Sequence, residues 1–282
     1  MSIAVAVVAG ALIGLSLGAL GGGGSILAVP VLVYLLDQSA SQATTGSLVV
    51  VGATSLTGAL TAHRAGNVLL GRGLLFGLVA IGGAIVGAKA SAQVADPVLL
   101  ASFAVLMLGV GSLMAVRQVR HARRTRSSVS RSGGAHAAPR PAFDDPIITF
   151  SPTFACQCPR ALKVLITATV VGMLTGFLGV GGGFLVVPAL VLALAMPTGY
   201  AAGTSLVVIT VTSAAALTVR AGVGATPDWT PVLVLTAAAA LGGVAGARLA
   251  DRSDTRKLSI AFTVLLLGVA LYTAARALPA LL

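Results

Sequence analysis

The chain has 282 residues, of which 57% are hydrophobic and only 9% are charged, and its formal net charge is +11. A soluble domain carries about 25% charged residues, so this composition excludes an ordinary soluble domain and predicts a membrane protein. The sequence contains no glutamate, and its aspartates all fall at expected segment ends or in loops. This distribution argues against a proton relay of membrane-embedded acids.

Apolar runs follow one another along the chain. A helix needs roughly 17 to 25 mostly apolar residues to cross the hydrocarbon core. Runs of this kind lie near 2–20, 43–62, 71–90, 98–116, 162–179, 200–219, 230–248 and 257–276. The first has no basic residue ahead of it and no convincing cleavage site after it, so we expect a mature membrane segment rather than a signal peptide. Shorter apolar pieces near 25–36 and 183–196 follow glycine-rich breaks.

The first break interrupts an apolar run with consecutive glycines and a serine: Gly21, Gly22, Gly23, Gly24 and Ser25. Each glycine costs a helix about 1 kcal/mol relative to alanine, so we expect the helix to open here. The helix that follows would present unpaired N–H groups and a partial positive charge, which favour an anion. The alternative is that the glycines only permit close helix crossing. We favour that alternative for the i,i+4 glycine pairs at 14 and 18, 172 and 176, and 83 and 87.

The sequence is internally repeated. GLSLGALGGGGSILAVPVLVYLL begins at Gly14, and GMLTGFLGVGGGFLVVPALVLAL begins at Gly172, 158 residues later. The second copy supplies the second break, formed by Gly179, Gly181, Gly182 and Gly183. Pro30 and Pro188 follow the two breaks at the same distance, and we expect both to interrupt helices.

Hydroxyl-bearing and basic residues also recur in matched positions. The candidate substrate hydroxyls are Thr45, Ser47, Thr204 and Ser205, for which bonding to their own helix carbonyls is the alternative. The candidates for anion attraction or gating are Arg64, Lys89, Arg220 and Arg248. For Lys89 and Arg248, which end an apolar segment, snorkelling to the interface is the alternative. The expected site relies on backbone N–H groups and hydroxyls, without a buried arginine.

The repeats, residues 1–117 and 162–282, are joined by a basic connector at 118–161 that we expect to lack regular structure. Its arginines favour a cytoplasmic loop over nucleic-acid binding. Charge placement predicts inverted repeats of about five segments each, about ten in all, with both termini outside. Cys156 and Cys158 leave metal or redox chemistry open beside free cytosolic thiols.

The paired motifs GALGGGGSILAVPVL and GFLGVGGGFLVVPAL, with the GAK and GAR endings, resemble the sulfite exporter TauE/SafE family of bacterial membrane permeases. The resemblance covers both repeats. It implies a duplicated fold in the bacterial cytoplasmic (inner) membrane and the transport of sulfur-containing anions. The family motifs fall on 21–30 and 179–188, and the basic endings on Lys89 and Arg248. The copies differ where Ser25 stands opposite Gly183.

We therefore predict an all-α polytopic membrane protein of two inverted repeats. The predicted function is secondary transport of a small anion, with sulfite or another sulfur oxyanion or organosulfonate favoured, by alternating access between the glycine breaks. We expect no catalysis, cofactor, metal or nucleic acid, with the anion and membrane lipid as partners. The coupling ion, proton or sodium, and the oligomeric state stay open. A membrane scaffold that recruits a partner through the connector is the alternative.

Overall fold

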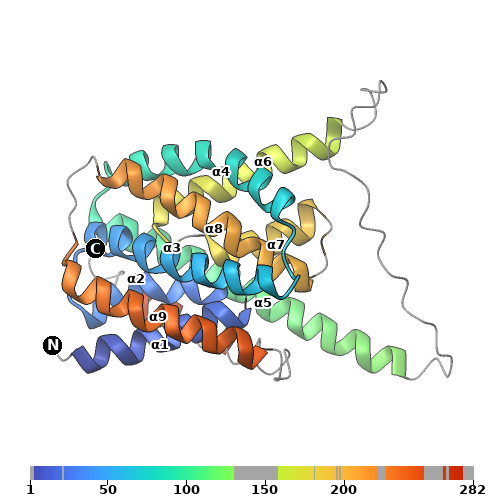
Figure 1. The fold of residues 1–282 in the computed structure, drawn as a ribbon, viewed down its shortest axis with the longest axis horizontal. Helices are drawn as coiled ribbons and strands as arrows, with labels where there is room; N and C mark the ends of the chain where they lie inside the picture. The colour runs from blue at the N-terminus through green and yellow to red at the C-terminus, as the bar shows by residue number, and fades with distance from the viewer. Residues whose placement is uncertain are drawn as a thin grey trace.

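The structure is a computed structural model that describes residues 3–20, 22–129, 158–180, 182–194, 196, 198–221, 227–250, 263–264 and 267–275. No strand occurs among these residues. The helices are α1 (Ile3–Leu20), the 3₁₀ helix η1 (Gly23–Leu27), α2 (Ala28–Pro30), the π-helical turn η2 (Val31–Leu35), α3 (Ala40–Arg64), α4 (Leu70–Ser91), α5 (Asp96–Val129), α6 (Cys158–Leu178), α7 (Gly183–Ala193), α8 (Thr198–Ala221) and α9 (Trp229–Ala250) (Figure 1).

The all-α polytopic prediction is confirmed. Among the described residues, five helices are long and apolar enough to cross a membrane: α3, α4, α5, α8 and α9. The segments after the two breaks are short, as expected from the sequence, and cover 23–35 and 183–193. Helix α3 starts at a capping box, in which the Ser39 hydroxyl accepts from the Gln42 amide and the Gln42 side chain accepts from the Ser39 amide.

The helix bounds differ from expectation at the connector and at one proline. Helix α5 continues to Val129, twelve residues beyond the expected repeat end, and α6 already begins at Cys158. Residues 130–157, including Cys156, lie outside the described part of the chain. The expectation that Pro188 breaks its helix is wrong, because α7 runs through it from Gly183 to Ala193. An internal proline removes one backbone hydrogen bond from the helix, and this loss can be tolerated where other protein surrounds the helix.

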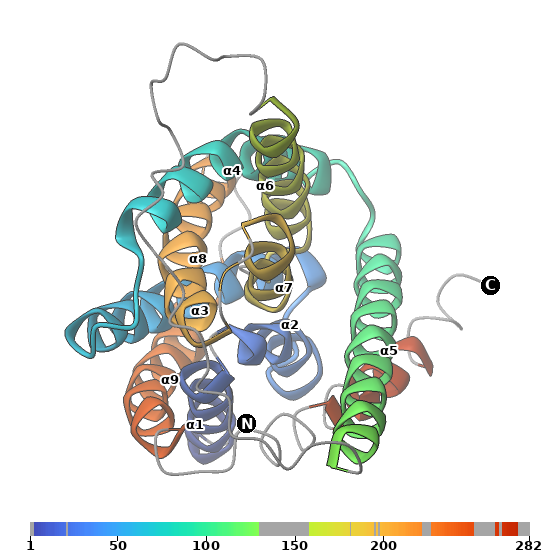
Figure 2. The same ribbon diagram turned by 90° about the vertical axis from the view of Figure 1, so that its right-hand side faces the viewer.

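The two repeats exchange their packing partners. Helix α1 packs on α9, α4 packs on α6, and α3 packs on α8 between these two pairs (Figures 1 and 2). Under the 158-residue offset α1 corresponds to α6, and the shared GGA and GGV segments match α4 with α9. The α1–α9 and α4–α6 pairs are therefore equivalent contacts, each made between repeats.

Helix directions follow from the residues that meet at these crossings. Along α1 and α9, Gly10 lies beside Leu235 and Gly18 beside Gly243, so these two helices run parallel. Three further pairs are parallel by the same criterion: α4 with α6, α4 with α8, and α3 with α9. Helices α3 and α8 are antiparallel, since Gly52 lies beside Ser213 whereas Gly58, further along α3, lies beside the earlier residue Leu206. Each of α1, α3 and α4 thus runs opposite to its counterpart in the second repeat.

The paired glycines act as packing residues at these crossings, as the sequence analysis favoured. A Cβ on Gly14 would collide with the carbonyl oxygen of Ala239, and one on Gly18 with that of Gly243. In the equivalent crossing, a Cβ on Gly172 would collide with Ala80 and one on Gly176 with Ala84. The helix backbones are in direct contact, so these positions accept only glycine.

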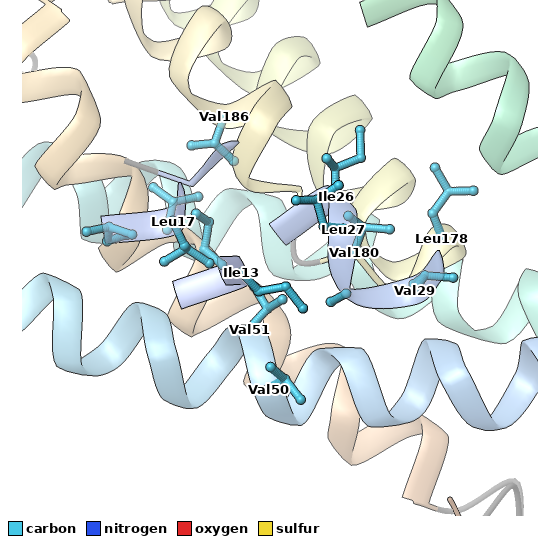
Figure 3. Close-up of a cluster of buried hydrophobic side chains, with 14 of the residues drawn as sticks. Ile13, Leu17, Ile26, Leu27, Val29, Val50, Val51, Leu178, Val180 and Val186 are labelled. Atoms are coloured by element: carbon cyan, nitrogen blue, oxygen red, sulfur yellow. The ribbon is translucent and has the colours of Figure 1, made fainter. Parts of the chain in front are cut away.

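The hydrophobic core surrounds the two breaks. Buried side chains of α1, α3 and the segments after both breaks form one cluster, in which Figure 3 labels Ile13, Leu17, Ile26, Leu27, Val29, Val50, Val51, Leu178, Val180 and Val186. The broken segments therefore lie inside protein, where the bilayer permits a helix to be interrupted.

Candidate functional site

Both glycine breaks are tight turns that end in a helix start. Gly22 is the N-cap of η1 with φ 112°, and Gly182 is the N-cap of α7 with φ 62°. These left-handed conformations are open to glycine and strained for other residues. Each break therefore combines a glycine in the left-handed conformation with a new helix start, although the 158-residue offset pairs Gly22 with Val180 and Gly24 with Gly182. Gly21 and Gly181 lie outside the described residues.

The two turns touch each other. A Cβ built on Gly22 would lie 2.9 Å from the Cα of Gly183, and both glycines lie against the side chain of Ile209 in α8. Backbone meets backbone without a side chain between them. The breaks, which are remote in sequence, thus form one structural unit at the contact of the two repeats. A ligand between them would have to part the turns.

Each turn leads directly into the first residues of a helix. Gly23, Gly24 and Gly183 lie in the first turn of their helices, where N–H groups have no intrahelical carbonyl to bond. The carbonyl of Gly182 accepts from the amides of Leu185 and Val186, which fixes the start of α7. Ser25 performs a similar task in the first repeat, because its buried hydroxyl and its amide both donate to the Gly22 carbonyl.

The predicted hydroxyls bond mainly to backbone. Thr45 donates to the Ser41 carbonyl of its own helix, and Ser205 donates to that of Ala202. The single Ser47 hydroxyl hydrogen can be shared between two carbonyl acceptors, that of Thr44 in its own helix and, across the repeats, that of Gly179. Thr204 accepts from the amide of Leu69, which also crosses the repeats at 3.1 Å.

These contacts give Ser47 and Thr204 a clear structural role. Ser47 ties α3 to the second glycine turn, and Thr204 ties α8 to the start of α4. Gly179 is pressed so closely against Thr44 that a Cβ would lie 2.8 Å from the Cα of Thr44. The start of α3 therefore supports the second turn directly.

The matched arginines are not equivalent. Arg64, Lys89 and Arg248 are exposed at the ends of their helices, and for Lys89 and Arg248 this is the position that the interfacial alternative describes. Arg220 is only 4% exposed. The expectation of a site without a buried arginine is therefore wrong: a guanidinium lies inside the protein, beside the second turn.

Arg220 is held by oxygen atoms of three other helices. Its Nη1 donates to the Thr44 hydroxyl at 2.7 Å, and its Nη2 donates to the Ser91 hydroxyl at the end of α4. Nη2 also lies 3.3 Å from the carbonyls of Gly176 and of Phe177 in the last turn of α6. All these acceptors are neutral, and cations are favoured at helix C-termini. The candidate hydroxyls chosen from the sequence do not include Thr44 or Ser91, because no sequence pattern links these residues to Arg220.

A helical bundle in which two broken segments meet inside the protein is the architecture of a polytopic membrane permease. Residues 6–273 match the family described as sulfite exporter TauE/SafE, and the chain belongs to this family. Two relatives from Xylella fastidiosa, strains Temecula1 (ATCC 700964) and 9a5c, are each named probable membrane transporter protein. Each is 33% identical over 207 residues, which cover 73% of this chain and 69% of the relative. No solved structure matches the chain. The protein is a multi-pass membrane transporter.

Proposed function

We propose that the protein is a secondary transporter that moves a small anion, a sulfur oxyanion or organosulfonate, by alternating access across the bacterial inner membrane. The observation that carries this proposal is the contact between Gly22 and Gly183, where one glycine turn from each repeat meets its partner. Opposed helix starts at the centre of two repeats suit an anion, because their N–H groups can replace its hydration shell.

Helix directions support the inverted arrangement. Helix α3 runs antiparallel to α8, and α1 and α9 run opposite to α4 and α6. These directions are the ones expected of an inverted-topology transporter, and they support the proposal. Rocking one repeat against the other would part the turns and open the anion site to alternate sides. The arginines of the connector favour a cytoplasmic position for it, in keeping with this arrangement.

Charge and family support an anionic substrate. The buried guanidinium of Arg220 lies at the end of α6, immediately before the second turn. The described aspartates, Asp37, Asp96 and Asp228, lie at helix ends or in links rather than inside the spans. The family description names sulfite, and we extend that name to the class of tetrahedral or pyramidal sulfur oxyanions.

Uptake into proteoliposomes tests this function. We expect flux of labelled sulfite, thiosulfate or a sulfonate with the wild-type protein, and a loss of about tenfold or more in Gly183→Ala, because its methyl group would strike the Gly22 backbone. Gly82→Ala is the matched control, since a Cβ there meets no described atom within 4 Å. Wild-type flux in Gly183→Ala would contradict the site. Absence of any anion flux, with loss of cellular function on connector deletion, would favour the scaffold alternative.

A further inference from the structure

Arg220 joins four helices on one side of the protein. It belongs to α8, and its hydrogen bonds reach the start of α3, the last residue of α4 and the last turn of α6. Two of these helices come from each repeat. Because the guanidinium presents its donors in a rigid fork, one side chain can hold several elements at once.

This junction is on the side away from the connector. Helix α6 begins at Cys158, within the last residues of the connector, and Arg220 binds carbonyls in the final turn of this helix, at its opposite end. Thr44 accepts the hydrogen bond from Nη1 and also lies against Gly179. Thr44 therefore connects this junction to the second glycine turn.

The described residues show no equivalent junction around the arginine of the first repeat. Arg64 is the counterpart of Arg220, because each begins an RAG segment, and Arg64 is exposed. The positions that correspond to the acceptors Thr44 and Ser91 are Ala202 and Ala250, which have no hydroxyl. The repeat therefore conserves the arginine between its halves while only one half carries the side-chain acceptors.

The hydrogen bonds of Arg220 are suited to reversible release. They all go to neutral oxygens, and Nε, which is buried, has no partner among the described residues. A buried ion pair would be held by full opposite charges and would be hard to separate. Neutral acceptors hold the guanidinium in place, while water or an anion can replace them when the helices move apart.

We propose that Arg220 is a positioning residue that latches shut the side of the transporter away from the connector, and that the connector side has no such latch. This inference rests on the proposed function, because a latch has a purpose only where the two sides open in turn. The protein then has unequal sides: a guanidinium closes one of them, and Arg64, its counterpart at the other, is exposed.

Cysteine accessibility tests the latch. Val180, 1% exposed beside the second turn, is changed to cysteine in a chain carrying Cys156→Ser and Cys158→Ser. A membrane-impermeant maleimide is applied to right-side-out and inside-out vesicles. We expect Arg220→Gln to raise the labelling rate from the side away from the connector about tenfold, the equivalent of one lost hydrogen bond to a charged group. Arg64→Gln, the matched control, should leave the rate unchanged.

Arg220→Lys tests whether the hydrogen bonds of the guanidinium or only its positive charge keeps this side closed. Lysine keeps the positive charge, but its single nitrogen cannot span the acceptors that Nη1 and Nη2 reach separately. We expect labelling close to that of Arg220→Gln. Wild-type labelling in Arg220→Lys, or equal increases from both sides in Arg220→Gln, would overturn the proposal, since a purely structural loss has no sidedness.

Two further measurements keep the result decisive. If Arg220→Gln does not yield folded protein, the double variant Thr44→Ala and Ser91→Ala removes the side-chain acceptors and should show the same one-sided increase; an unchanged rate would overturn the latch. Wild-type anion flux is measured in parallel. Flux with equal labelling in all variants would refute the latch alone, whereas one-sided labelling without flux would refute the transport function alone.

Discussion

The two repeats agree where helices cross and differ where helices end. Gly14 on α1 and Gly172 on α6 occupy equivalent positions and lie against equivalent helix backbones. Arg64 and Arg220 also occupy equivalent positions, yet the first is exposed and the second is buried among three other helices. The repeats thus share the helix contacts that set the fold and differ at their helix ends.

The largest effect is expected from disrupting the glycine contacts at the helix crossings, which both repeats have. Gly14→Leu and Gly172→Leu each force a side chain into a backbone contact, and each should destabilise the protein by about 3 kcal/mol or more. Thermal unfolding followed by size-exclusion chromatography measures this loss. Gly109→Leu, where a Cβ meets no described atom within 4 Å, should behave as wild type. A large loss in only one of the two crossing variants would show that the crossings are not equivalent.

A smaller effect should separate the two arginines. Arg220→Met removes donors from the Thr44 and Ser91 hydroxyls and from two carbonyls, and should lower the free energy of unfolding by about 2 kcal/mol. Arg64→Met should leave stability unchanged, because Arg64 is exposed. The same thermal assay compares them. Equal free energies of unfolding in the two variants would contradict the claim that only Arg220 stabilises the protein.

The smallest effect concerns the hydroxyls. Thr204→Ala leaves the Leu69 amide without its acceptor across the repeats, and should cost about 1 kcal/mol. Hydrogen exchange at Leu69 should accelerate. Thr45→Ala is the control, because its hydroxyl bonds a carbonyl of its own helix. Unchanged exchange at Leu69 in Thr204→Ala would show that this contact does not tie α8 to α4.

Much of the architecture was predictable from local pattern. The apolar runs predicted the long helices, and the repeated glycines predicted both the helix crossings and the broken segments, because each depends on residue type and spacing alone. Gly22 and Gly183 meet as expected for opposed breaks. Whether an anion binds there stays a prediction.

The helix ends could not be predicted, for a physical reason. The burial of Arg220 depends on where α4 and α6 stop, and the residues concerned, Ser91, Gly176 and Phe177, are remote from it in sequence. Sequence alone made Arg64 and Arg220 look alike. The roles of the hydroxyls were also ambiguous from the sequence. A threonine in a membrane helix can donate its hydroxyl hydrogen to a backbone carbonyl or to a ligand, and the residue type does not distinguish the two.

A ligand-bound structure tests the central claim most directly. The protein would be determined in lipid with a sulfur oxyanion that it transports in proteoliposomes. The account predicts density for the anion between the two glycine turns, with the Gly22 and Gly183 backbones separated from their present contact. Density for the anion elsewhere, with Gly22 and Gly183 still touching in a transport-active protein, would contradict it.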